Sequence, residues 1–464
     1  MTAVDGARRR GVEALDARAP EGSEDELALA FALAWSRTFL YVPGLGWLFW
    51  EGGRWNRDLK RRAFDAMRKI ARERAMAAEK ELDRKRIAAA KTVAAINTLA
   101  SCDPRLVRGA DDLDADPMAL NTPAGIVDLR SGEVHPHDRD LVTKQTAVAP
   151  DFLAPCPTWI GFLEDVFIGD RDLIAFVRRF LGYVLTGDTR EHVFAFCFGD
   201  GANGKSTLLD LLIWLLADYA LKLPATVLMA QRGERHPTEL AQLRGVRLAV
   251  ASELDEGAHW GEARLKELTG DETLTARYVR GDFFTFKLLA KIVIAGNHRP
   301  QFRAVDDAVR RRLLLVPFAA KFLGDKRDAE MLSKLKAEAP AILAWMIGGC
   351  LEWQRTGLQV PATIRAASEE YATTMDSMAG WMADCCRLTG DPLDATKASL
   401  LYRSYSDWKR ARGEAPVSMT RWAEQMRSRG FESYRSDGVR YRAIDLTPGE
   451  RRRIEDADID RSAE

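Results

Sequence analysis

The chain has 464 residues, 47% of them hydrophobic, so it is long enough to form several domains with sizeable apolar cores. Its 68 Lys and Arg balance 68 Asp and Glu, which excludes a uniformly basic or acidic protein. The six cysteines form no CxxC pair, which argues against a zinc site or a disulfide framework. With no signal-type leader and no long apolar run, we expect a reduced, cytoplasmic protein that does not enter a membrane.

The first third of the chain predicts a disordered leader followed by an α+β domain. Residues 1–24 are charged and rich in small side chains, which is typical of a disordered leader. The domain is expected over residues 25–155. It begins with an apolar helical stretch at 27–42 and continues with a β-hairpin that turns at Gly52-Gly53. Short strands joined by glycine turns are expected at 119–136.

Residues 54–91 read as a long basic helical region with 14 Lys or Arg against 6 Asp or Glu. Such an excess occurs on solvated helix faces and also on surfaces that contact nucleic acid. The pattern alone leaves both interpretations open.

Three further regions follow in chain order. Residues 156–190 form amphipathic helical segments, which we interpret as a collar or linker. Residues 191–320 alternate apolar strands with helices, the pattern of an α/β domain with a parallel sheet. Residues 321–390 are helical again.

The segment GDGANGKS at residues 199–206 fits the phosphate-loop pattern GxxxxGK[ST] completely, between an apolar strand and an apolar helix. Glycines let such a loop turn its N–H groups toward phosphate oxygens, and the helix dipole adds positive potential. We expect Lys205 to contact the β- and γ-phosphates of ATP and the Ser206 hydroxyl to ligate Mg²⁺. The predicted nucleotide-binding residues are Gly199, Gly201, Asn203, Gly204, Lys205, Ser206 and Thr207.

A nucleotide-hydrolysing site also needs groups that hold the metal and orient water. Glu253 follows the apolar run 248–251 and is the predicted metal and water ligand, with Glu256 as a weaker partner carboxylate. Asn297 ends the apolar strand 292–295 and is expected near the γ-phosphate or the attacking water. An acidic turn and a turn-forming Asn are the plain alternatives for these positions.

Two basic features complete the pattern. Arg310, Arg311 and Arg312 precede another apolar strand, where an arginine could stabilise transferred charge at the site of a neighbouring subunit. Two strands meeting near Arg280-Gly281-Asp282 predict a hairpin just before the Asn297 strand, with Tyr278 and Arg280 at its tip. A basic, aromatic tip suits contact with nucleic acid, although a plain surface hairpin would look similar.

The order of these motifs resembles the superfamily 3 helicases, in particular the phage and plasmid primase-helicases related to those of poxviruses. The resemblance rests on GDGANGKST, RLAVASELDEG, LKELTGDETLTARYVRGDFFTF, IAGNHRP and DDAVRRRLLLVPF, and it covers roughly residues 30–385. It implies a P-loop, AAA+-like ATPase core over 191–320 that assembles as a ring, usually a homo-hexamer.

The resemblance further implies that ATP lies between subunits. Lys205, Ser206, Glu253 and Asn297 would come from one subunit and Arg311 or Arg312 from the next. Arg280 would lie at a DNA-gripping tip, and Lys291 matches a DNA-binding lysine. Many relatives also carry a primase domain. Because about 190 residues precede the loop and Asp114–Pro117 holds only a lone DxD, we expect no priming activity in this chain.

The C-terminal region predicts a winged-helix-like module over 391–447 and a charged tail over 448–464. Two helices, the second capped by Ser418, precede a hairpin that turns at Asp437-Gly438. Residues 401–453 hold 13 Lys or Arg against 7 Asp or Glu. Arg421, Arg427, Arg435 and Arg440 are therefore candidate DNA contacts, although winged helices also bind proteins.

The sequence thus predicts an ATP- and Mg²⁺-dependent DNA helicase that acts on single-stranded and forked DNA in phage or plasmid replication. A separate primase and other replication proteins are possible partners. Two alternatives stay open. One is a DNA-binding initiator that uses ATP only to lock an assembly. The other is a P-loop kinase for a small molecule.

Overall fold

The computed structural model describes residues 19–137, 141–229, 237–252, 260–270, 273–277, 283–297, 307–324, 327–375, 377–391, 393–413 and 415–462. The chain divides into two compact units. Unit 1 contains residues 1–300 and 312–364, and unit 2 contains residues 301–311 and 365–464.

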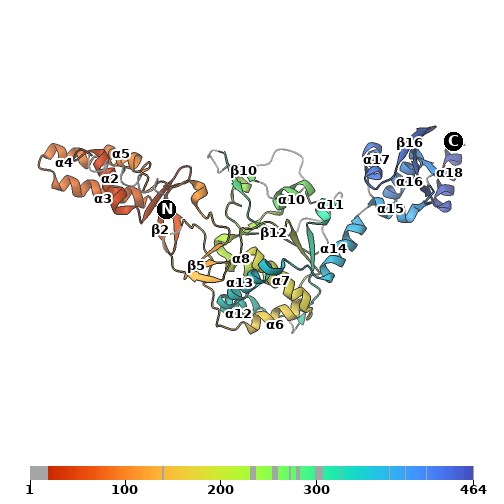
Figure 1. Cartoon of the computed structure of the whole chain (residues 1–464), viewed down its shortest axis with the longest axis horizontal. Coiled ribbons are helices and arrows are strands. Elements are labelled where there is room, and N and C mark those ends of the chain that lie inside the picture. The colour runs from red at the N-terminus through yellow and green to blue at the C-terminus, as the bar shows by residue number, and fades with distance from the viewer. Residues whose placement is uncertain are drawn as a thin grey trace. The chain divides into compact units, whose positions relative to one another are not determined.

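Unit 1 begins with a helical cluster and a small antiparallel sheet in the order β1-β2-β3 (Figure 1). Ser23 caps the first helix because its Oγ accepts a hydrogen bond from the Glu26 amide at 3.1 Å. The helices bury Phe31, Met67 and Ile96 against one another, and Cys102 lies exposed just after the last of them. The elements are α2 (Glu24–Trp35), β1 (Phe39–Val42), β2 (Gly46–Glu51), β3 (Arg54–Arg57), α3 (Arg62–Ala77), α4 (Glu81–Ile87) and α5 (Ala90–Ala100).

Two predictions for this region need correction. The stretch 27–42 is not one helix, because α2 ends at Trp35 and residues 39–42 form β1, which pairs with β2. The region 54–91 is likewise not helical throughout, since its first residues form β3. In both places apolar or aromatic residues gain cross-strand partners, and this tertiary pairing overrides the local helical pattern. The predicted turn at Gly52-Gly53 is confirmed, and it places Trp50 directly opposite Trp55.

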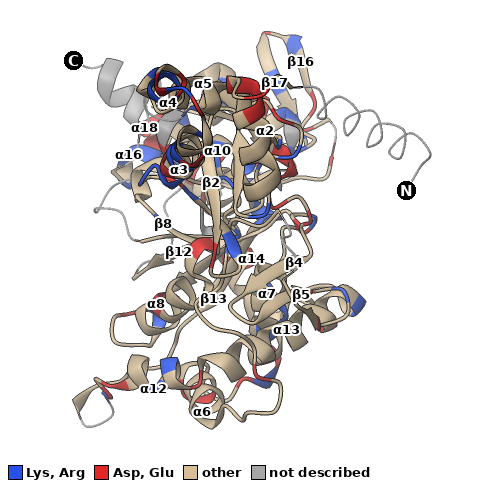
Figure 2. Ribbon diagram, turned by 90° about the vertical axis from the view of Figure 1, so that its left-hand side faces the viewer, with Lys and Arg blue, Asp and Glu red and all other residues tan. Residues whose placement is uncertain are grey.

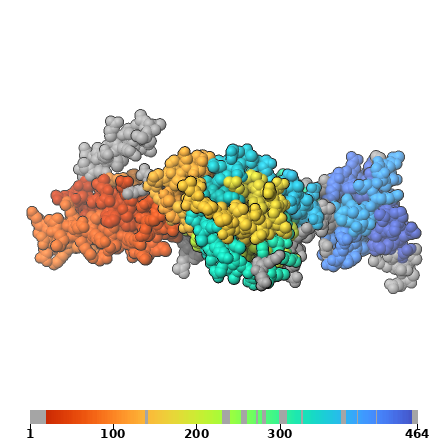
Figure 3. Space-filling view, turned by 90° about the horizontal axis from the view of Figure 1, so that it is seen from below, coloured from red at the N-terminus to blue at the C-terminus, as the bar shows by residue number. Residues whose placement is uncertain are grey.

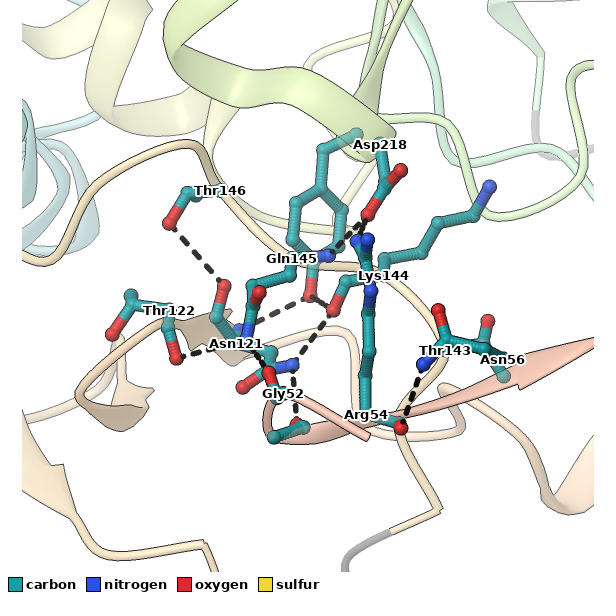
Figure 4. A network of polar contacts seen from close by, with 12 residues as sticks. Gly52, Arg54, Asn56, Asn121, Thr122, Thr143, Lys144, Gln145, Thr146 and Asp218 are labelled. Atoms are coloured by element: carbon teal, nitrogen blue, oxygen red, sulfur yellow. Dashed lines mark hydrogen bonds and ion pairs between the residues drawn. The ribbon is translucent and has the colours of Figure 1, made fainter. Parts of the chain in front are cut away.

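A three-stranded antiparallel meander follows, formed by β4 (Ala119–Thr122), β5 (Gly125–Asp128) and β6 (Glu133–His135). A polar network connects it to the β2–β3 turn and to the core of the unit (Figure 4). The Asn121 amide donates to the carbonyls of Gly53 at 3.0 Å and Lys144 at 2.9 Å. Gln145 donates from its side chain to Gly52 O at 2.8 Å and from its backbone to Asp218 at 3.1 Å. The loop 143–146 is therefore held from both sides.

The core of unit 1 is a five-stranded sheet in the order β13-β7-β12-β9-β8, and each neighbouring pair is parallel. Three of its strands run through the interior as nearly continuous apolar segments, as parallel strands covered on both faces do. This agrees with the predicted parallel α/β sheet. The strands are β7 (Phe194–Phe198), β8 (Ala220–Leu223), β9 (Leu248–Ala251), β12 (Lys291–Gly296) and β13 (Leu313–Pro317).

Helices that come before, between and after the strands in the sequence pack around the sheet. They contribute to the largest apolar cluster among the described residues (Figure 1). The Asp170 side chain caps α7 by accepting from the Leu173 amide at 3.0 Å. On the face seen in Figure 3, the yellow residues of α6 and α7 lie beside the blue-green residues of α12 and α13. These helices are α6 (Pro157–Val166), α7 (Arg171–Val184), α8 (Lys205–Leu216), α12 (Met331–Ala337) and α13 (Ala339–Thr356). Two further helices, α9 (Pro237–Ala241) and α10 (Glu262–Thr269), also belong to unit 1, whereas α11 (Asp307–Arg310) belongs to unit 2.

Strands β10 (Thr273–Arg277) and β11 (Phe283–Lys287) form a separate antiparallel pair inserted before β12. The hairpin predicted at this point of the chain is therefore present. Its predicted tip, residues 278–282, lies outside the described residues.

Unit 2 packs helices against short strands around Trp381, Tyr405 and Trp422, each of which lies on a different helix. The predicted order of helix, helix and hairpin is confirmed, with Ser436 paired to Gly438 across the turn. As predicted, Ser418 caps the second helix, accepting from the Arg421 amide at 3.4 Å. The elements are α14 (Ala362–Met375, which begins in unit 1), α15 (Ser377–Cys385), β14 (Cys386–Leu388), β15 (Ala395–Lys397), α16 (Ala398–Ala411), α17 (Met419–Ser428), β16 (Ser433–Ser436), β17 (Gly438–Arg442), β18 (Ile444–Leu446) and α18 (Pro448–Ser462).

Among the residues that the structure describes, no helix combines the length and the apolar character needed to cross a lipid bilayer.

A close contact between α7 and α13 gives a first prediction. A Cβ on Gly182 would lie 2.0 Å from the Cys350 amide nitrogen, so any side chain there must separate the two helices. We expect Gly182→Ala to lower the free energy of unfolding by about 1–3 kcal/mol, measured by urea titration. Gly161→Ala in α6 is the matched control, because nothing lies within 4 Å of its Cβ. The control should raise the free energy of unfolding by about 0.5–1 kcal/mol. Equal effects of the two substitutions would show that the close contact at Gly182 does not limit stability.

Candidate functional site

The predicted phosphate loop connects the end of β7 to the start of α8. Helix α8 begins at Lys205 after Gly204, and no side chain caps its amino end. The first N–H groups of a helix have no acceptor within the helix and carry the positive end of its dipole, although the Lys205 N–H here donates to Asn203 Oδ1 at 3.4 Å. The loop thus presents donors and positive potential at the carboxyl edge of the parallel sheet, where ligands of such sheets bind.

Gly199 is required by the path of the loop. Its φ of +146° is rarely adopted by other residues, and a Cβ would lie 2.2 Å from the Phe318 carbonyl oxygen. The Asn203 amide donates to the carbonyls of Asp200 at 2.5 Å and Phe318 at 3.2 Å, which fixes the loop from its inner side. Asn203 is only 3% exposed, so its role here is structural.

Lys205 and Asn297, predicted from separate motifs, come together. The Lys205 ammonium donates to the Asn297 side-chain oxygen at 3.4 Å and also contacts the Gly199 carbonyl. Strand register explains the meeting, because Gly296 at the end of β12 pairs with Phe198 at the end of β7. The lysine is only 6% exposed, so a cation lies at the base of the site, beside an amide that can accept or donate.

A cavity of about 480 Å³ opens over these groups. Its lining includes Asn297 and six of the seven predicted nucleotide-binding residues: Gly201, Asn203, Gly204, Lys205, Ser206 and Thr207. Sequence reasoning missed other lining residues, which come from α6 and from the segment after β13: Asp165, Phe322, Arg327 and Asp328. No motif marks these positions. Arg327 matters most, since it brings a guanidinium to a cavity already suited to anions.

The predicted carboxylates cannot be placed in the same way. Glu253 and Glu256 lie outside the described residues, as do Tyr278 and Arg280. What the structure does define is the strand that leads to Glu253. Its last residue, Ala251, pairs with Ile294 of β12, so β9 ends at the same edge of the sheet as β7.

The predicted arginines lie away from the loop along the sheet. Arg312 precedes β13, whose first residue Leu313 pairs with Phe194 at the start of β7. The loop follows the opposite end of β7, five residues further on, a separation of about 17 Å along the strand. Arg311, the neighbouring candidate, is exposed. The structure therefore does not bring either arginine to the Lys205 cavity through β13.

The prediction that Lys291 contacts DNA is not supported by its position. Its side chain is 2% exposed, and its ammonium donates to the carbonyls of Thr186 and, at 3.2 Å, Leu289. It also lies 4.8 Å from the centre of the Tyr183 ring. Burial holds the pKa of Lys291 well below its usual range, and the charge of Arg247 acts in the same direction. The lysine is an interior group that joins β12 to the end of α7.

The candidate DNA contacts of unit 2 lie at or near its surface. Arg421 and Arg427 are exposed on α17, and Arg435 is exposed on β16. Arg440 on β17 is half-buried and donates to the Ala395 carbonyl at 3.3 Å. These side chains are accessible to a ligand, but nothing in their contacts identifies one.

The sequence matches two protein families. Residues 28–168 match the family described as D5 N terminal like, and residues 197–312 match a family of unknown function (DUF5906). The first match spans the helical cluster and the meander, and the second spans the parallel sheet with its loop.

Curated viral proteins are similar to the same part of the chain. "Putative helicase L207/L206" of Acanthamoeba polyphaga mimivirus is 25% identical over 270 residues, covering 53% of this chain and 28% of that protein. "Putative helicase 022R" of Frog virus 3 is 26% identical over 284 residues, covering 56% and 29%. "Putative primase C962R" of African swine fever virus (isolate Tick/Malawi/Lil 20-1/1983) is 24% identical over 214 residues, covering 43% and 22%. The chain thus corresponds to less than a third of each relative.

The fold is also similar to a solved structure, the apo C-terminal region of NrS-1, with a TM-score of 0.51 over 88% of this chain and 96% of that one, at 13% identity. Taken together, the two family matches and the viral relatives, whose names are putative helicase and putative primase, support the resemblance to poxvirus-type primase-helicases found in the sequence.

The burial of Lys291 has a measurable consequence. Because its pKa is lowered in the folded state, the unfolded chain binds more protons below the ordinary value of 10.5. The free energy of unfolding therefore rises with pH between the lowered pKa of the folded state and 10.5, by up to about 1.4 kcal/mol per pH unit for one proton. We expect Lys291→Met to reduce the slope of unfolding free energy against pH in urea titrations at alkaline pH. Lys69→Met, at an exposed lysine of α3, is the control and should keep it. A variant at position 291 with the wild-type slope would refute the interior placement.

Proposed function

We propose that the protein is an ATP-dependent DNA helicase of superfamily 3 that serves phage or plasmid replication. The observation that carries the proposal is the meeting of Lys205 and Asn297, 3.4 Å apart, over one cavity at the carboxyl edge of the sheet. Two motifs about ninety residues apart would not converge in this way if they were an isolated loop and an unrelated turn.

The residues present fit a nucleoside triphosphate with Mg²⁺. The uncapped start of α8 and the Lys205 ammonium suit phosphate oxygens, and the exposed Ser206 hydroxyl suits a metal ion beside them. Mg²⁺, when bound, would neutralise charge that develops on the phosphates. Asn297 would orient the attacking water, and Glu253, with Glu256 as its partner, would accept the proton of that water. Lys205 would hold the phosphates in line.

The arginines support an arrangement in which a second subunit completes the site. Arg312 precedes the amino end of β13, whereas the loop follows the carboxyl end of the adjacent β7. In a ring, Arg311 or Arg312 of one subunit would reach the phosphates held by its neighbour, as an arginine finger does. A homo-hexamer is the assembly that we propose.

Movement of DNA would be coupled through the β10–β11 hairpin. This hairpin joins α10 to β12, the strand that ends in Asn297, so a change at the nucleotide has a short covalent route to it. Tyr278 and Arg280 would contact the strand at its tip, and Arg421, Arg427 and Arg440 of unit 2 would add phosphate contacts.

The nucleotide site is tested first. Lys205→Ala should abolish ATP binding and hydrolysis, because a buried cation at the phosphates is lost. ATP affinity by isothermal titration and phosphate release by a coupled assay report these effects. Lys321→Ala is the control, since Lys321 is 59% exposed, pairs with Asp200 at 2.9 Å beside the loop and does not line the cavity. Near-normal hydrolysis by the Lys205 variant would exclude this loop as the catalytic site.

The helicase reaction is tested by adding DNA to the wild-type chain. We expect single-stranded DNA to raise ATP turnover by at least about tenfold and a forked duplex to be unwound only with ATP and Mg²⁺. Strand separation is followed with a fluorophore and quencher on the two strands. Stimulation without unwinding would favour an initiator that only switches. Turnover that ignores DNA would favour the small-molecule kinase.

A further inference from the structure

Three cavities of unit 1 are neighbours, because the middle one shares lining residues with each of the other two. The largest, of about 900 Å³, lies between strand β3 and the base of the β10–β11 hairpin, and we call it the hairpin cleft. A middle cavity of about 300 Å³ shares Leu45 and Arg57 with the hairpin cleft. The third, of about 650 Å³, lies along α3 and shares Arg61 and Phe64 with the middle cavity; we call it the α3 groove.

The α3 groove is basic along its whole length. Arg68 and Arg72 lie four residues apart on one face of α3, and Arg61, which precedes the helix, lines the same groove. Lys60 adds a further cation to the lining, and Asp65 is its acidic member. The Asp65 carboxylate is already paired with Arg68 and Lys69, each at 3.3 Å. Figure 2 marks Lys and Arg in blue and Asp and Glu in red along the ribbons of α3 and α4.

In the hairpin cleft, the acidic side chains are largely engaged by the protein itself. Asp218 pairs with Arg54 and accepts from the Gln145 amide. Asp114 accepts from the Thr143 amide at 2.8 Å, and Asp188 pairs with Arg190. Further cations line the cleft: Arg57, Lys144, Lys287 and Arg244, of which Arg244 pairs with Asp111 at 3.8 Å.

Lys144 is the most informative of these cations. Its backbone is fixed by the network in Figure 4, while its side chain extends away from that network. Within the described part of the chain, its ammonium has no recorded hydrogen bond or ion pair. Burial lowers the pKa of Lys144, and nearby Arg244 and Arg54 add to this effect against the opposing charge of Asp114. An anion in the cleft would relieve this cost.

Aromatic residues alternate with the cations along these three cavities. Phe64 lines both the α3 groove and the middle cavity, Trp47 lines the middle cavity, and Trp55 and Phe286 line the hairpin cleft. The indole N–H of Trp55 is buried and lacks a hydrogen-bond partner among the described residues. Cations that track a backbone, interleaved with aromatic rings, are characteristic of surfaces that bind single-stranded nucleic acid.

We propose that the α3 groove, the middle cavity and the hairpin cleft form one binding path for a single strand of DNA, leading it from α3 to the base of the β10–β11 hairpin. The proposal rests on the proposed helicase function and adds to it a route outside the hairpin tip. It also gives the basic region 54–91 a nucleic-acid role in place of a merely solvated face.

The test measures binding of fluorescein-labelled thirty-residue oligothymidine to the full chain by anisotropy at several salt concentrations. Arg68→Ala/Arg72→Ala removes two exposed cations of the α3 groove, and Lys144→Met removes the charge in the hairpin cleft while keeping its stem. We expect about tenfold weaker binding for the double variant. Its slope of log affinity against log salt should fall by about 1.4, at about 0.7 per phosphate contact.

The matched control is Lys85→Ala/Arg355→Ala, which removes the same charge from exposed positions of α4 and α13 that line none of the three cavities. It should bind like the wild type. Melting temperatures of all variants identify any loss of folding.

Two outcomes overturn the path: path variants that bind oligothymidine like the control, or variants that lose affinity for duplex DNA only. Failure of the proposed function would look different. In that case the wild type shows no DNA-stimulated ATP turnover, while the path variants still lose affinity for the single strand.

Discussion

The site depends on one close approach between two backbones, that of Gly199 and the carbonyl of Phe318. A side chain cannot fit between them, and Asn203 donates to the same carbonyl at 3.2 Å. The segment after β13 is thereby fastened to the loop after β7. Phe322 and Arg327 follow in that segment and line the same cavity as Lys205, and the Phe322 amide donates to the Ala202 carbonyl at 2.7 Å. The Phe318 carbonyl therefore links the phosphate loop, which the sequence motif predicts, to residues that no motif predicts.

The sequence predicts well what depends on local order. Apolar runs define β7, β9, β12 and β13, and a parallel sheet places their carboxyl ends together, which is why Lys205 and Asn297 are found in contact. The sequence predicts poorly where contacts between segments distant in the chain determine the structure. Residues 39–42 have a helix-compatible apolar pattern, but they pair with β2. Lys291 resembles a DNA-binding lysine, yet the turn after α7 closes over it. Arg327 belongs to no motif, so only the folded chain shows it.

The balanced overall charge hides a strongly uneven distribution. Several acidic residues of unit 1 form ion pairs within the unit, such as Asp218 with Arg54 and Asp188 with Arg190. Helix α3 keeps an excess of cations even though several of them are paired: Arg68 and Lys69 share Asp65, and Arg74 pairs with Glu26. The formal net charge counts both members of every ion pair inside the fold, whereas a ligand meets only the charges at the surface. Net charge is thus a poor guide to the binding partners of this chain.

The uneven exposure of the thiols has a practical consequence for spectroscopy. Cys102, just after α5, is exposed, Cys156 is half-buried, and the other four cysteines are buried. Burial raises the pKa of Cys197 and of Cys350 to about 12, so these thiols resist alkylation at neutral pH. A maleimide dye added to the native chain would therefore report chiefly from one position in the helical cluster, without any cysteine being removed by mutation.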